Sequence, residues 1–282
     1  MRATIQYIEQ ELKGLYPKTE ILAFTRLILE HVCGLNYTEQ VLSRDNPLAD
    51  QFRIKINEMV KRLQFYEPIQ YILGETEFLG LKILVSPSVL IPRPETEELV
   101  QWVCKTQLPD SPDLLDAGTG SGCIALALKK LIPNAKVKAF DISLQALEVA
   151  RNNAAINNLE VDFFDADILK WENFSWQKFN IIVSNPPYVR ESEKKIMEKN
   201  VLKYEPQNAL FVADNDPLLF YRRILEFTRR YLSKKGWLFF EINETFGSQL
   251  IELIQQYGFS ETEIKKDLYG KSRMLRCRKN FS

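Results

Sequence analysis

Apolar positions at helical spacing dominate the first part of the chain. They recur every three or four residues and are Ile5, Ile8, Leu12, Leu15, Ile21, Phe24, Leu27, Ile28 and Val32. Asn46 followed by Pro47 predicts the N-cap and first turn of a further helix, because proline suits the first helical position. We therefore expect residues 1–66 to form a small helical-bundle domain.

The pattern changes at residue 67. Residues 67–94 contain four prolines and two glycines, and the prolines flank residues 78–85, where apolar and polar positions alternate. Proline and glycine mark turns, and alternation is typical of a strand. This stretch predicts a β-hairpin linker.

A second domain is predicted over residues 95–282. Short apolar segments there alternate with helical segments, and they are residues 114–118, 137–141, 180–185 and 237–243. Alternation of strand and helix is the pattern of a doubly wound parallel sheet. We expect an α/β domain of the Rossmann-like kind.

Composition and charge narrow the class of protein and of partner. Hydrophobic residues make up 45% and charged residues 26% of the chain, which excludes a disordered, collagen-like or disulfide-scaffold protein. Basic and acidic residues both number 37, so no global positive field attracts nucleic acid or anionic lipid. Residues 1–70 are balanced as well, which favours a protein partner for the bundle. We expect a solvated face from the basic residues near the C-terminus, namely Lys265, Lys266, Lys271, Arg273, Arg276, Arg278 and Lys279.

Cysteine and histidine usage disfavours metal chemistry. The four cysteines, Cys33, Cys104, Cys123 and Cys277, form no Cys-x-x-Cys pair, and the chain has a single histidine, His31. We expect no metal site and no histidine-based catalytic triad, and we interpret the cysteines as free thiols of a reducing compartment. Because no signal-peptide segment or membrane span is evident, we expect a cytoplasmic protein.

The first motif with chemical content is Asp116-Ala117-Gly118-Thr119-Gly120-Ser121-Gly122, which follows an apolar strand and precedes a helix. Alternate glycines let the backbone approach a ligand closely, and the helix N-terminus presents free amide donors. Asp141 ends the next strand, 19 residues beyond Gly122, where its carboxylate meets ribose hydroxyls. Taken alone, the loop is also compatible with a structural turn, and Asp141 with a helix N-cap. The spacing differs from Gly-x-Gly-x-x-Gly, and no Lys-Ser/Thr pair follows, which excludes an ATP-binding P-loop.

The second motif is Asn185-Pro186-Pro187-Tyr188, directly after the apolar residues 181–184. Strand ends of open parallel sheets bind ligands, and proline removes backbone donors. The Asn185 side-chain oxygen and the Pro186 carbonyl can each accept one N–H of a planar amino group, and Tyr188 can stack on its flat face. We expect catalysis from Asn185, Pro186 and Tyr188, and substrate binding from these residues and Pro187. The alternative is a buried asparagine in a proline-rich turn.

The two motifs together resemble the S-adenosylmethionine site of class I methyltransferases. The resemblance implies that Asp116 lies near the methionine end, Asp141 on the ribose, and Asp167 with Ile168 beside the adenine, although Asp162 and Asp165 compete for this last role. It further implies cofactor binding by Gly118, Thr119, Gly120, Ser121, Gly122, Asp141 and Asn185. The Asn-Pro-Pro-Tyr motif is shared by methyltransferases of glutamine amide, adenine and guanine amino groups, so it leaves the acceptor open.

Six segments together resemble the HemK/PrmC family of peptide chain release factor glutamine methyltransferases: PIQYILG (68–74), FLG (78–80), VLIPRPETEELV (89–100), LDAGTGSGCIALAL (115–128), SNPPYV (184–189) and EPQNAL (205–210). The resemblance covers nearly the whole chain. It implies methyl transfer from S-adenosylmethionine to the Gly-Gly-Gln glutamine of class 1 release factors, with the helical domain docking on the factor and no direct nucleic acid substrate or membrane. The alternatives are an amino-methyltransferase of adenine or guanine in DNA or RNA, and a non-enzymatic scaffold, against which the intact Asn-Pro-Pro-Tyr motif argues.

Some features fit this family less directly. VADNDPLLFY (212–221) replaces a glycine-rich run and EIN (241–243) a common EIG, and we expect both to lie outside the methyl-transfer centre. Arg93 and Glu95 are interpreted either as lining a cleft between the domains or as a solvated linker salt bridge. The same choice applies to Glu205 and Pro206.

Overall fold

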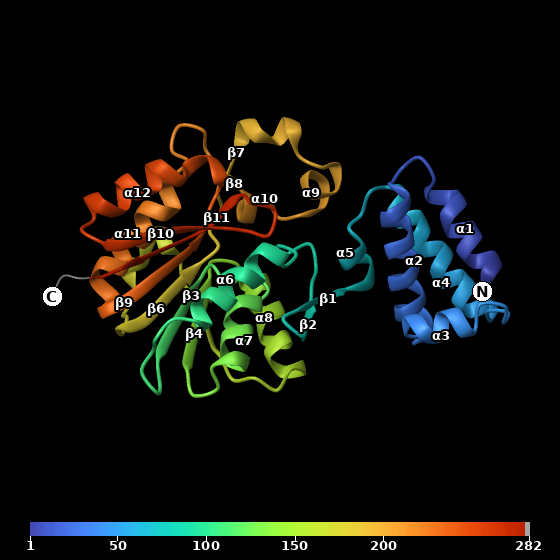
Figure 1. The fold of residues 1–282 in the computed structure, drawn as a ribbon, viewed down its shortest axis with the longest axis horizontal. Coiled ribbons are helices and arrows are strands. Elements are labelled where there is room, and N and C mark those ends of the chain that lie inside the picture. The colour runs from blue at the N-terminus through green and yellow to red at the C-terminus, as the bar shows by residue number, and fades with distance from the viewer. Residues whose placement is uncertain (280–282) are drawn as a thin grey trace. The chain divides into compact units, whose positions relative to one another are not determined.

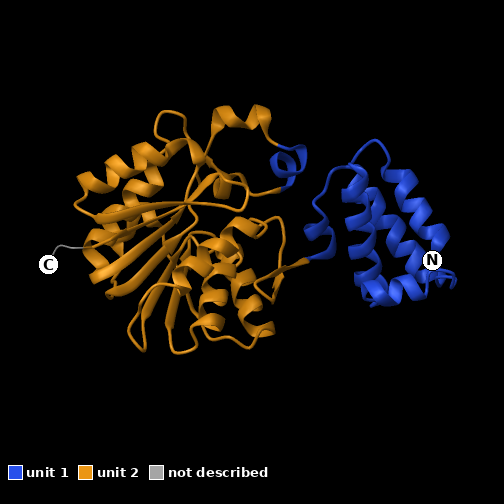
Figure 2. Cartoon of the chain, viewed as in Figure 1, with its two compact units in different colours: residues 1–74, 198–204 blue, residues 75–197, 205–282 orange. Residues whose placement is uncertain are grey.

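The computed structural model describes residues 1–279 and divides the chain into two compact units (Figures 1 and 2). The first unit consists of residues 1–74 together with 198–204, and the second contains the rest of the chain. Each unit has its own hydrophobic core.

The first unit is an all-helical bundle made by α1 (Arg2–Leu12), α2 (Lys18–Cys33), α3 (Tyr37–Leu42), α4 (Asp50–Gln64) and α5 (Ile69–Leu73). Its core combines buried residues that the helical spacing singles out, such as Ile8 and Leu12, with Ile69 and Ile72 of α5. Because α5 buries its apolar side chains in this core, the unit extends to Gly74, beyond the boundary at residue 66 that the sequence pattern indicates.

The start of α4 differs from the prediction at Asn46 and Pro47. The helix begins at Asp50, and its N-cap is Ala49, without a side-chain cap. The backbone of Asn46 is used otherwise, since its carbonyl accepts a hydrogen bond from the Met1 ammonium and its N–H donates to the Ser43 carbonyl. The prediction of a helix at Pro47 was therefore wrong by one turn.

The remaining segment of the first unit comes from the second half of the chain. Helix α9 (Lys199–Tyr204) packs against the end of α4. The Tyr204 hydroxyl donates to the Phe65 carbonyl at 3.1 Å, and the Lys199 ammonium lies 5.1 Å from the centre of the Tyr66 ring. The chain thus leaves the second unit after residue 197 and re-enters it at residue 205.

The second unit opens with the hairpin β1 (Glu75–Phe78) and β2 (Leu81–Leu84), followed by α6 (Pro94–Cys104). Its central sheet has the strand order β10-β11-β9-β6-β3-β4-β5. The strands are β3 (Asp113–Ala117), β4 (Lys136–Asp141), β5 (Asp162–Asp165), β6 (Phe179–Ser184), β9 (Leu232–Glu241), β10 (Ser260–Lys266) and β11 (Ser272–Arg278). β3, β4, β5, β6 and β9 pair in parallel, whereas β11 runs antiparallel to β9 and β10 antiparallel to β11.

Helices cover both faces of this sheet (Figure 1). They are α6, α7 (Cys123–Leu131) and α8 (Leu144–Ile156) on one face, and α11 (Leu219–Tyr231) and α12 (Gly247–Gln256) on the other. Short elements complete the unit: η1 (Ile168–Asn173), β7 (Val189–Arg190), η2 (Glu191–Ile196), α10 (Gln207–Leu210), β8 (Phe211–Val212) and η3 (Glu244–Phe246). The predicted doubly wound α/β architecture with an N-terminal helical bundle is confirmed.

The strand order places a topological switch point beside β3. From β3 the chain proceeds outward to β4 and β5, then crosses to the other side of β3 to form β6. Ligands of open α/β sheets bind at the carboxyl ends of the strands where the order reverses. The segments that follow β3, β4 and β6 are therefore where the site belongs, and they contain both sequence motifs.

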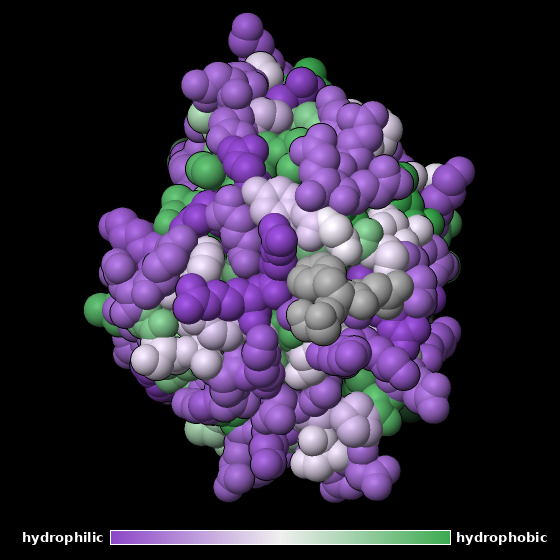
Figure 3. All heavy atoms as spheres, turned by 90° about the vertical axis from the view of Figure 1, so that its left-hand side faces the viewer, coloured by the Kyte–Doolittle hydropathy of each residue, from purple (hydrophilic) through white to green (hydrophobic). Residues whose placement is uncertain are grey.

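Hydrophilic side chains cover most of the face shown in Figure 3, with small and scattered hydrophobic groups. Lys279 departs from the expected solvated face, since it is 5% exposed and donates to the carbonyls of Arg229 and Leu232. Of the other basic tail residues, Lys266 and Lys271 are exposed, and Lys265, Arg273, Arg276 and Arg278 are half-buried.

The cysteines are free, with Cys123 and Cys277 buried and Cys33 and Cys104 half-buried. Within residues 1–279, no group of three or more histidine, cysteine or acidic side chains is arranged to hold a metal ion. No helix in the same range combines the length and apolarity needed to cross a membrane.

Candidate active site

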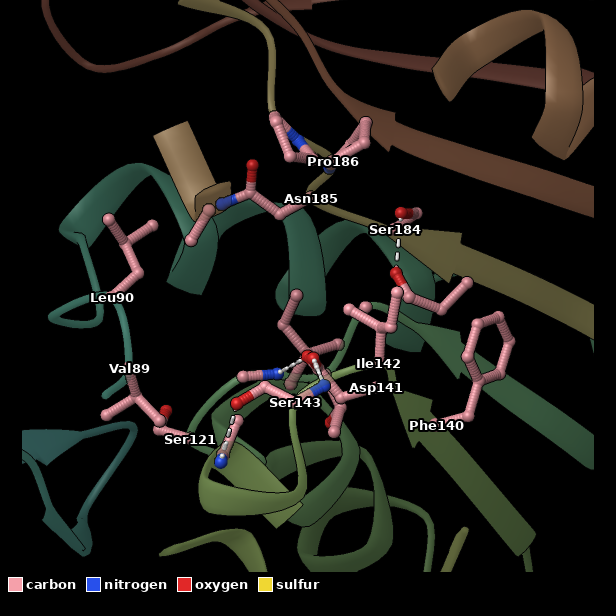
Figure 4. A pocket seen from close by; sticks show the side chains of 18 of the residues that line it. Val89, Leu90, Ser121, Phe140, Asp141, Ile142, Ser143, Ser184, Asn185 and Pro186 are labelled. Carbon is pink, nitrogen blue, oxygen red and sulfur yellow. Dashed lines mark hydrogen bonds between the residues drawn. The ribbon is translucent and has the colours of Figure 1, made fainter. Parts of the chain in front are cut away.

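A cavity of about 290 Å³ opens at the carboxyl ends of β3, β4 and β6. In Figure 4, Val89 and Leu90 form one side, while Asn185 and Pro186 lie above Asp141. Both sequence motifs contribute to the lining, together with segments to which the sequence analysis gave no site role. The fold thus brings residues from several distant positions of the chain to one cavity.

The glycine loop borders the cavity directly after β3. Gly118, Gly120 and Gly122 all have positive φ, of 77°, 55° and 81°, a conformation that side chains disfavour. A Cβ on Gly118 or Gly120 would meet no other atom within 4 Å, so these two positions leave free space on the ligand side. A Cβ on Gly122 would lie 3.0 Å from the Ala150 Cβ, so this glycine is needed for packing against α8. The loop is therefore both a turn and a binding surface.

Asp116 lies below the loop and is fully buried. The Thr119 hydroxyl donates to its Oδ2 at 2.6 Å, while its Oδ1 has no hydrogen-bond partner. Burial raises the pKa of Asp116 to about 7, against the lowering effect of the hydrogen bond from Thr119. A buried carboxylate oxygen without a partner is costly. Asp116 is not among the residues that line the cavity, so its place near the methionine end of a cofactor stays a prediction.

Asp141 ends β4 and lines the cavity. Its Oδ2 accepts from the Gly120 N–H at 2.8 Å and its Oδ1 from the Ser143 N–H at 2.9 Å. The N-cap of α8 is Ser143, whose side chain accepts from the Ala146 N–H, so Asp141 is not the cap that its position also suggested. Each carboxylate oxygen retains acceptor capacity, and the assignment of Asp141 to a ribose stays a prediction.

The structure separates the three acids that compete for the place beside an adenine. Asp167 lines the cavity with Ile168 and Leu169, and its Oδ1 accepts from the Leu169 N–H at 2.8 Å. Asp162 is ion-paired with Lys138 on the outside of the sheet, and Asp165 is exposed at the end of β5. Asp167 is thus the acid that the cavity places best for this role.

The Asn-Pro-Pro-Tyr motif continues from the end of β6. Asn185, Pro186 and Pro187 line the cavity, and the preceding Ser184 hydroxyl donates to the Ala117 carbonyl at 2.7 Å, which ties β6 to β3. The Tyr188 hydroxyl donates to Glu241 Oε1 at 2.9 Å. The stacking role expected for Tyr188 stays a prediction, and the contact present in this structure anchors its hydroxyl to β9.

Several functional positions escaped the sequence reasoning. Residues 88–92 form one wall of the cavity. Asn153 of α8 is fully buried and links the hairpin to the glycine loop, since its Nδ2 donates to the carbonyls of Leu84 and Ser121. The sequence shows only an asparagine within a predicted helical segment, which does not by itself indicate this link.

Arg93 and Glu205 form an ion pair in which Arg93 lines the cavity and the Glu205 carboxylate is buried. The second Glu205 oxygen accepts from the Ile91 N–H at 3.3 Å. The solvated interpretation is therefore wrong for Glu205, whose pairing with Arg93 the sequence did not indicate. Burial of the carboxylate instead fixes the wall of the cavity that precedes α6.

The two departures from the family pattern lie near the site. The Asn243 Nδ2 donates to the Tyr188 carbonyl and to Glu193 Oε2, each at 3.3 Å. Phe220, within the segment VADNDPLLFY, lines the cavity. Residues 241–243 are not among those that line the cavity, and Asn243 reaches the motif only through the Tyr188 carbonyl. The expectation that both departures lie outside the methyl-transfer centre stays a prediction.

Comparison with known proteins gives consistent matches for both units. The family model described as PrmC N-terminal domain matches residues 3–74, and the model described as Methyltransferase small domain matches residues 96–211. A release factor glutamine methyltransferase of Flavobacterium psychrophilum is 48% identical over 95% of this chain and 95% of its own length. A protein of the same description from Bacteroides thetaiotaomicron is 44% identical over 98% and 99% of the two chains. The crystal structure of a methyltransferase from Pyrococcus furiosus shares the fold with a TM-score of 0.53 at 22% identity, covering 82% of this chain and 98% of that one.

A doubly wound sheet whose cavity is lined by a glycine loop, an acid at the end of the next strand and Asn185-Pro186-Pro187 defines a class I methyltransferase that uses S-adenosylmethionine. Sequence identity to release factor glutamine methyltransferases, over nearly the whole length of this chain and of theirs, narrows this class further. The chain belongs to the family of release factor glutamine methyltransferases.

The residues present fit S-adenosylmethionine. The Asp141 carboxylate lines the cavity and has acceptor capacity for ribose hydroxyls, and the free space beside Gly118 and Gly120 admits a ligand against the backbone. Apolar side chains such as Ile142 and Ile168 also line the cavity and suit an adenine ring.

Proposed function

We propose that this protein transfers a methyl group from S-adenosylmethionine to the side-chain amide nitrogen of the glutamine in the Gly-Gly-Gln motif of class 1 peptide chain release factors. The observation that carries the proposal is that Asn185 and Pro186 line the same cavity as the glycine loop and Asp141. The family supports the substrate, because its members are named for methylation of a glutamine in release factors.

The chemical difficulty of this reaction lies in the acceptor. An amide nitrogen is a poor nucleophile because its lone pair is delocalised into the neighbouring carbonyl. In our proposal the Asn185 Oδ1 and the Pro186 carbonyl each accept one N–H of the substrate amide, which increases electron density on the nitrogen and aims its lone pair. Pro186 and Pro187 lack backbone N–H groups, so this part of the loop offers acceptors without competing donors.

The cofactor-binding residues complete the assignment. In this assignment Asp141 would accept hydrogen bonds from the ribose hydroxyls, Asp116 would accept from the methionine ammonium, and Asp167 with Ile168 would border the adenine. S-adenosylmethionine, when bound, would supply a methyl group on a sulfonium, whose transfer to the amide nitrogen would leave a neutral thioether. The protein contributes proximity, orientation and fixed acceptors.

No strong general base is required in this scheme. The nitrogen becomes acidic once it is methylated, and it loses one proton to water or to a backbone carbonyl. The side chains that face the reacting amide therefore act as hydrogen-bond acceptors and hold it in place.

The charge balance argues for a protein substrate over nucleic acid. Basic and acidic residues both number 37, and Arg276 and Arg278 are ion-paired with Glu263 and Glu261. A protein that neutralises several phosphates needs clustered, unpaired basic side chains. We accordingly propose release factors, and not nucleic acid, as partners. We also propose that the protein acts in the cytoplasm and has no membrane partner.

The test is incubation with labelled S-adenosylmethionine and, separately, a class 1 release factor, duplex DNA and ribosomal RNA. We expect label on the release factor, and mass spectrometry of its peptides should locate a gain of one CH₂ group on the Gly-Gly-Gln glutamine. A gain at any other residue, or efficient labelling of DNA or RNA in place of the factor, would overturn the proposal.

A further inference from the structure

Behind the catalytic loop lies a buried carboxylate that the methyl-transfer scheme does not use. Glu241, at the end of β9, is 2% exposed. Its Oε2 accepts from the Thr96 hydroxyl at 2.6 Å and its Oε1 from the Tyr188 hydroxyl at 2.9 Å. The Thr96 oxygen in turn accepts from the Asn185 Nδ2 at 3.5 Å. A continuous chain of donors thus leads from Asn185 to Glu241.

The direction of this chain follows from the chemistry of its end. An ionised carboxylate only accepts hydrogen bonds, so the single proton of the Thr96 hydroxyl must point to Glu241. Toward Asn185 the Thr96 oxygen can therefore act only as a hydrogen-bond acceptor. Only the NH₂ group of the Asn185 amide can donate to it. The oxygen end of Asn185 is left facing away from Thr96.

The donors around Glu241 suit an ionised carboxylate, since the Thr96 and Tyr188 hydroxyls each donate to one of its oxygens. Burial and the Glu95 carboxylate raise the pKa of Glu241, and the hydrogen bonds from Thr96 and Tyr188 and the Arg273 guanidinium offset part of this rise. Tyr188 remains a donor, since burial and the charge of Glu241 raise the pKa of its hydroxyl well above the usual value. Arg273 is itself held by Asp267 at 3.7 Å and by the Ile242 carbonyl at 3.5 Å.

We propose that Glu241 is a positioning residue that acts through Thr96 to hold the Asn185 amide with its oxygen toward the substrate glutamine. An asparagine amide can rotate by half a turn at little cost, and the wrong orientation would present two donors to a substrate NH₂ that itself only donates. Glu241 prevents that rotation by fixing the proton of Thr96. This inference rests on the proposed function, because it gives the oxygen of Asn185 its role as acceptor.

Replacement of the carboxylate by an amide tests the proposal with minimal change in shape. In the Glu241→Gln variant the side chain has one acceptor and one donor, so the Thr96 proton is no longer fixed and Asn185 can reverse. We expect kcat on a release factor to fall at least about tenfold, while the KM for the factor and the Kd for S-adenosylmethionine stay within about twofold.

Thr96 supplies a second, independent pair of variants. Thr96→Val keeps the shape but removes the link and should lower kcat by a similar factor, whereas Thr96→Ser restores the hydroxyl and should return kcat to within about threefold of the wild type. Tyr221→Phe is the matched control, because the Tyr221 hydroxyl donates to the backbone carbonyl of Glu241 at 3.0 Å and takes no part in the chain of donors. It should lower the melting temperature and leave kcat within about twofold.

The double variant of Thr96→Val with Glu241→Gln decides whether the two residues act through one path. The loss caused by Glu241→Gln should shrink when Thr96 is already valine, because coupled residues are not additive. The proposal would be overturned if the two substitutions lowered kcat by independent factors that multiply in the double variant. It would also be overturned if Thr96→Val had wild-type kcat, and that outcome can be observed even if Glu241→Gln does not fold. Failure of the proposed function is distinguishable, since the wild-type protein would then not methylate the release-factor glutamine.

Discussion

At the scale of single residues, burial decides the charge of Asp116 in the ligand-free protein and raises its pKa to about 7. A hydrogen bond from the ammonium of S-adenosylmethionine requires the ionised carboxylate. Because protonation competes with binding, the affinity for the cofactor should weaken as the pH falls below 7, by up to about tenfold per pH unit. Titration calorimetry on both sides of this pH measures the effect.

The control for this titration is the Asp116→Asn variant, which has no carboxyl group to protonate. Its affinity for S-adenosylmethionine should be lower at high pH and nearly independent of pH. Constant affinity of the wild-type protein across the same range would show that Asp116 does not bind the ammonium.

Asn185 carries the chemical step in our scheme, and its substitution should separate catalysis from cofactor binding. Asn185→Ala removes an acceptor that strengthens in the transition state, so turnover should fall by about two orders of magnitude or more with little change in S-adenosylmethionine affinity. Single-turnover methylation of a release factor and calorimetry measure the two quantities. Near-normal turnover of the Asn185→Ala variant would contradict the amide-acceptor mechanism.

Asp141→Ala provides the contrasting variant for the same pair of measurements. It leaves donors of the ribose without an acceptor, and the affinity for S-adenosylmethionine should weaken by about 1–3 kcal/mol. Unchanged affinity in a folded variant would argue against the ribose assignment.

At the scale of elements, the turn from β3 to α7 uses its glycines for two different purposes. Gly122→Ala places a Cβ 3.0 Å from the Ala150 Cβ in a backbone conformation with φ of 81°, so it should destabilise the fold by about 1–3 kcal/mol. Gly118→Ala meets no protein atom within 4 Å and should cost about 1–2 kcal/mol from its φ of 77° alone. Denaturant unfolding gives both values.

Cofactor binding distinguishes the two glycine variants further. The alanine at 118 points into the space reserved for the ligand, so it should weaken S-adenosylmethionine binding more than the alanine at 122 does at equal folded fraction. If both variants lose stability and affinity in the same proportion, the loop does not divide its roles in this way.

At the scale of the whole molecule, the two units have separate hydrophobic cores, and the glycine loop and Asn-Pro-Pro-Tyr lie in the second unit. A chain without residues 1–74 should therefore still bind S-adenosylmethionine, within about threefold of the full protein, because the cofactor residues keep their own core. Methylation of an intact release factor should fall far more, since in our proposal the bundle docks on the factor.

A short peptide that contains Gly-Gly-Gln is the control substrate for this truncation. The shortened chain and the full protein should methylate the peptide at similar rates if the bundle serves docking alone. An equal loss on the peptide and on the intact factor would contradict that role and would point to damage of the second unit, for instance through α9, which loses its packing partners Phe65 and Tyr66.

The parts of the site that could be predicted are those whose residues lie close together in the sequence. The loop from Gly118 to Gly122 and the motif from Asn185 to Tyr188 each combine residue types whose backbone properties suit ligand binding, directly after an apolar strand. Asn46 misled the prediction of a helix start because its carbonyl is engaged with the Met1 ammonium instead. The contact of Asn243 with the Tyr188 carbonyl could not be predicted, because it depends on the return of β9 to the same edge of the sheet.

The sequence by itself determined the α/β architecture and the helical bundle, because hydrophobic periodicity and turn chemistry are local properties, and its motifs indicated the cofactor class through their resemblance to methyltransferases. Only the tertiary structure decided how the motifs are supported. Thr96 meets Glu241 across 145 positions and Arg93 meets Glu205 across 112, and no periodicity in the sequence links such positions. Pairing of this kind arises from the order of the strands and from burial, since a carboxylate withdrawn from water must find donors wherever the fold brings them.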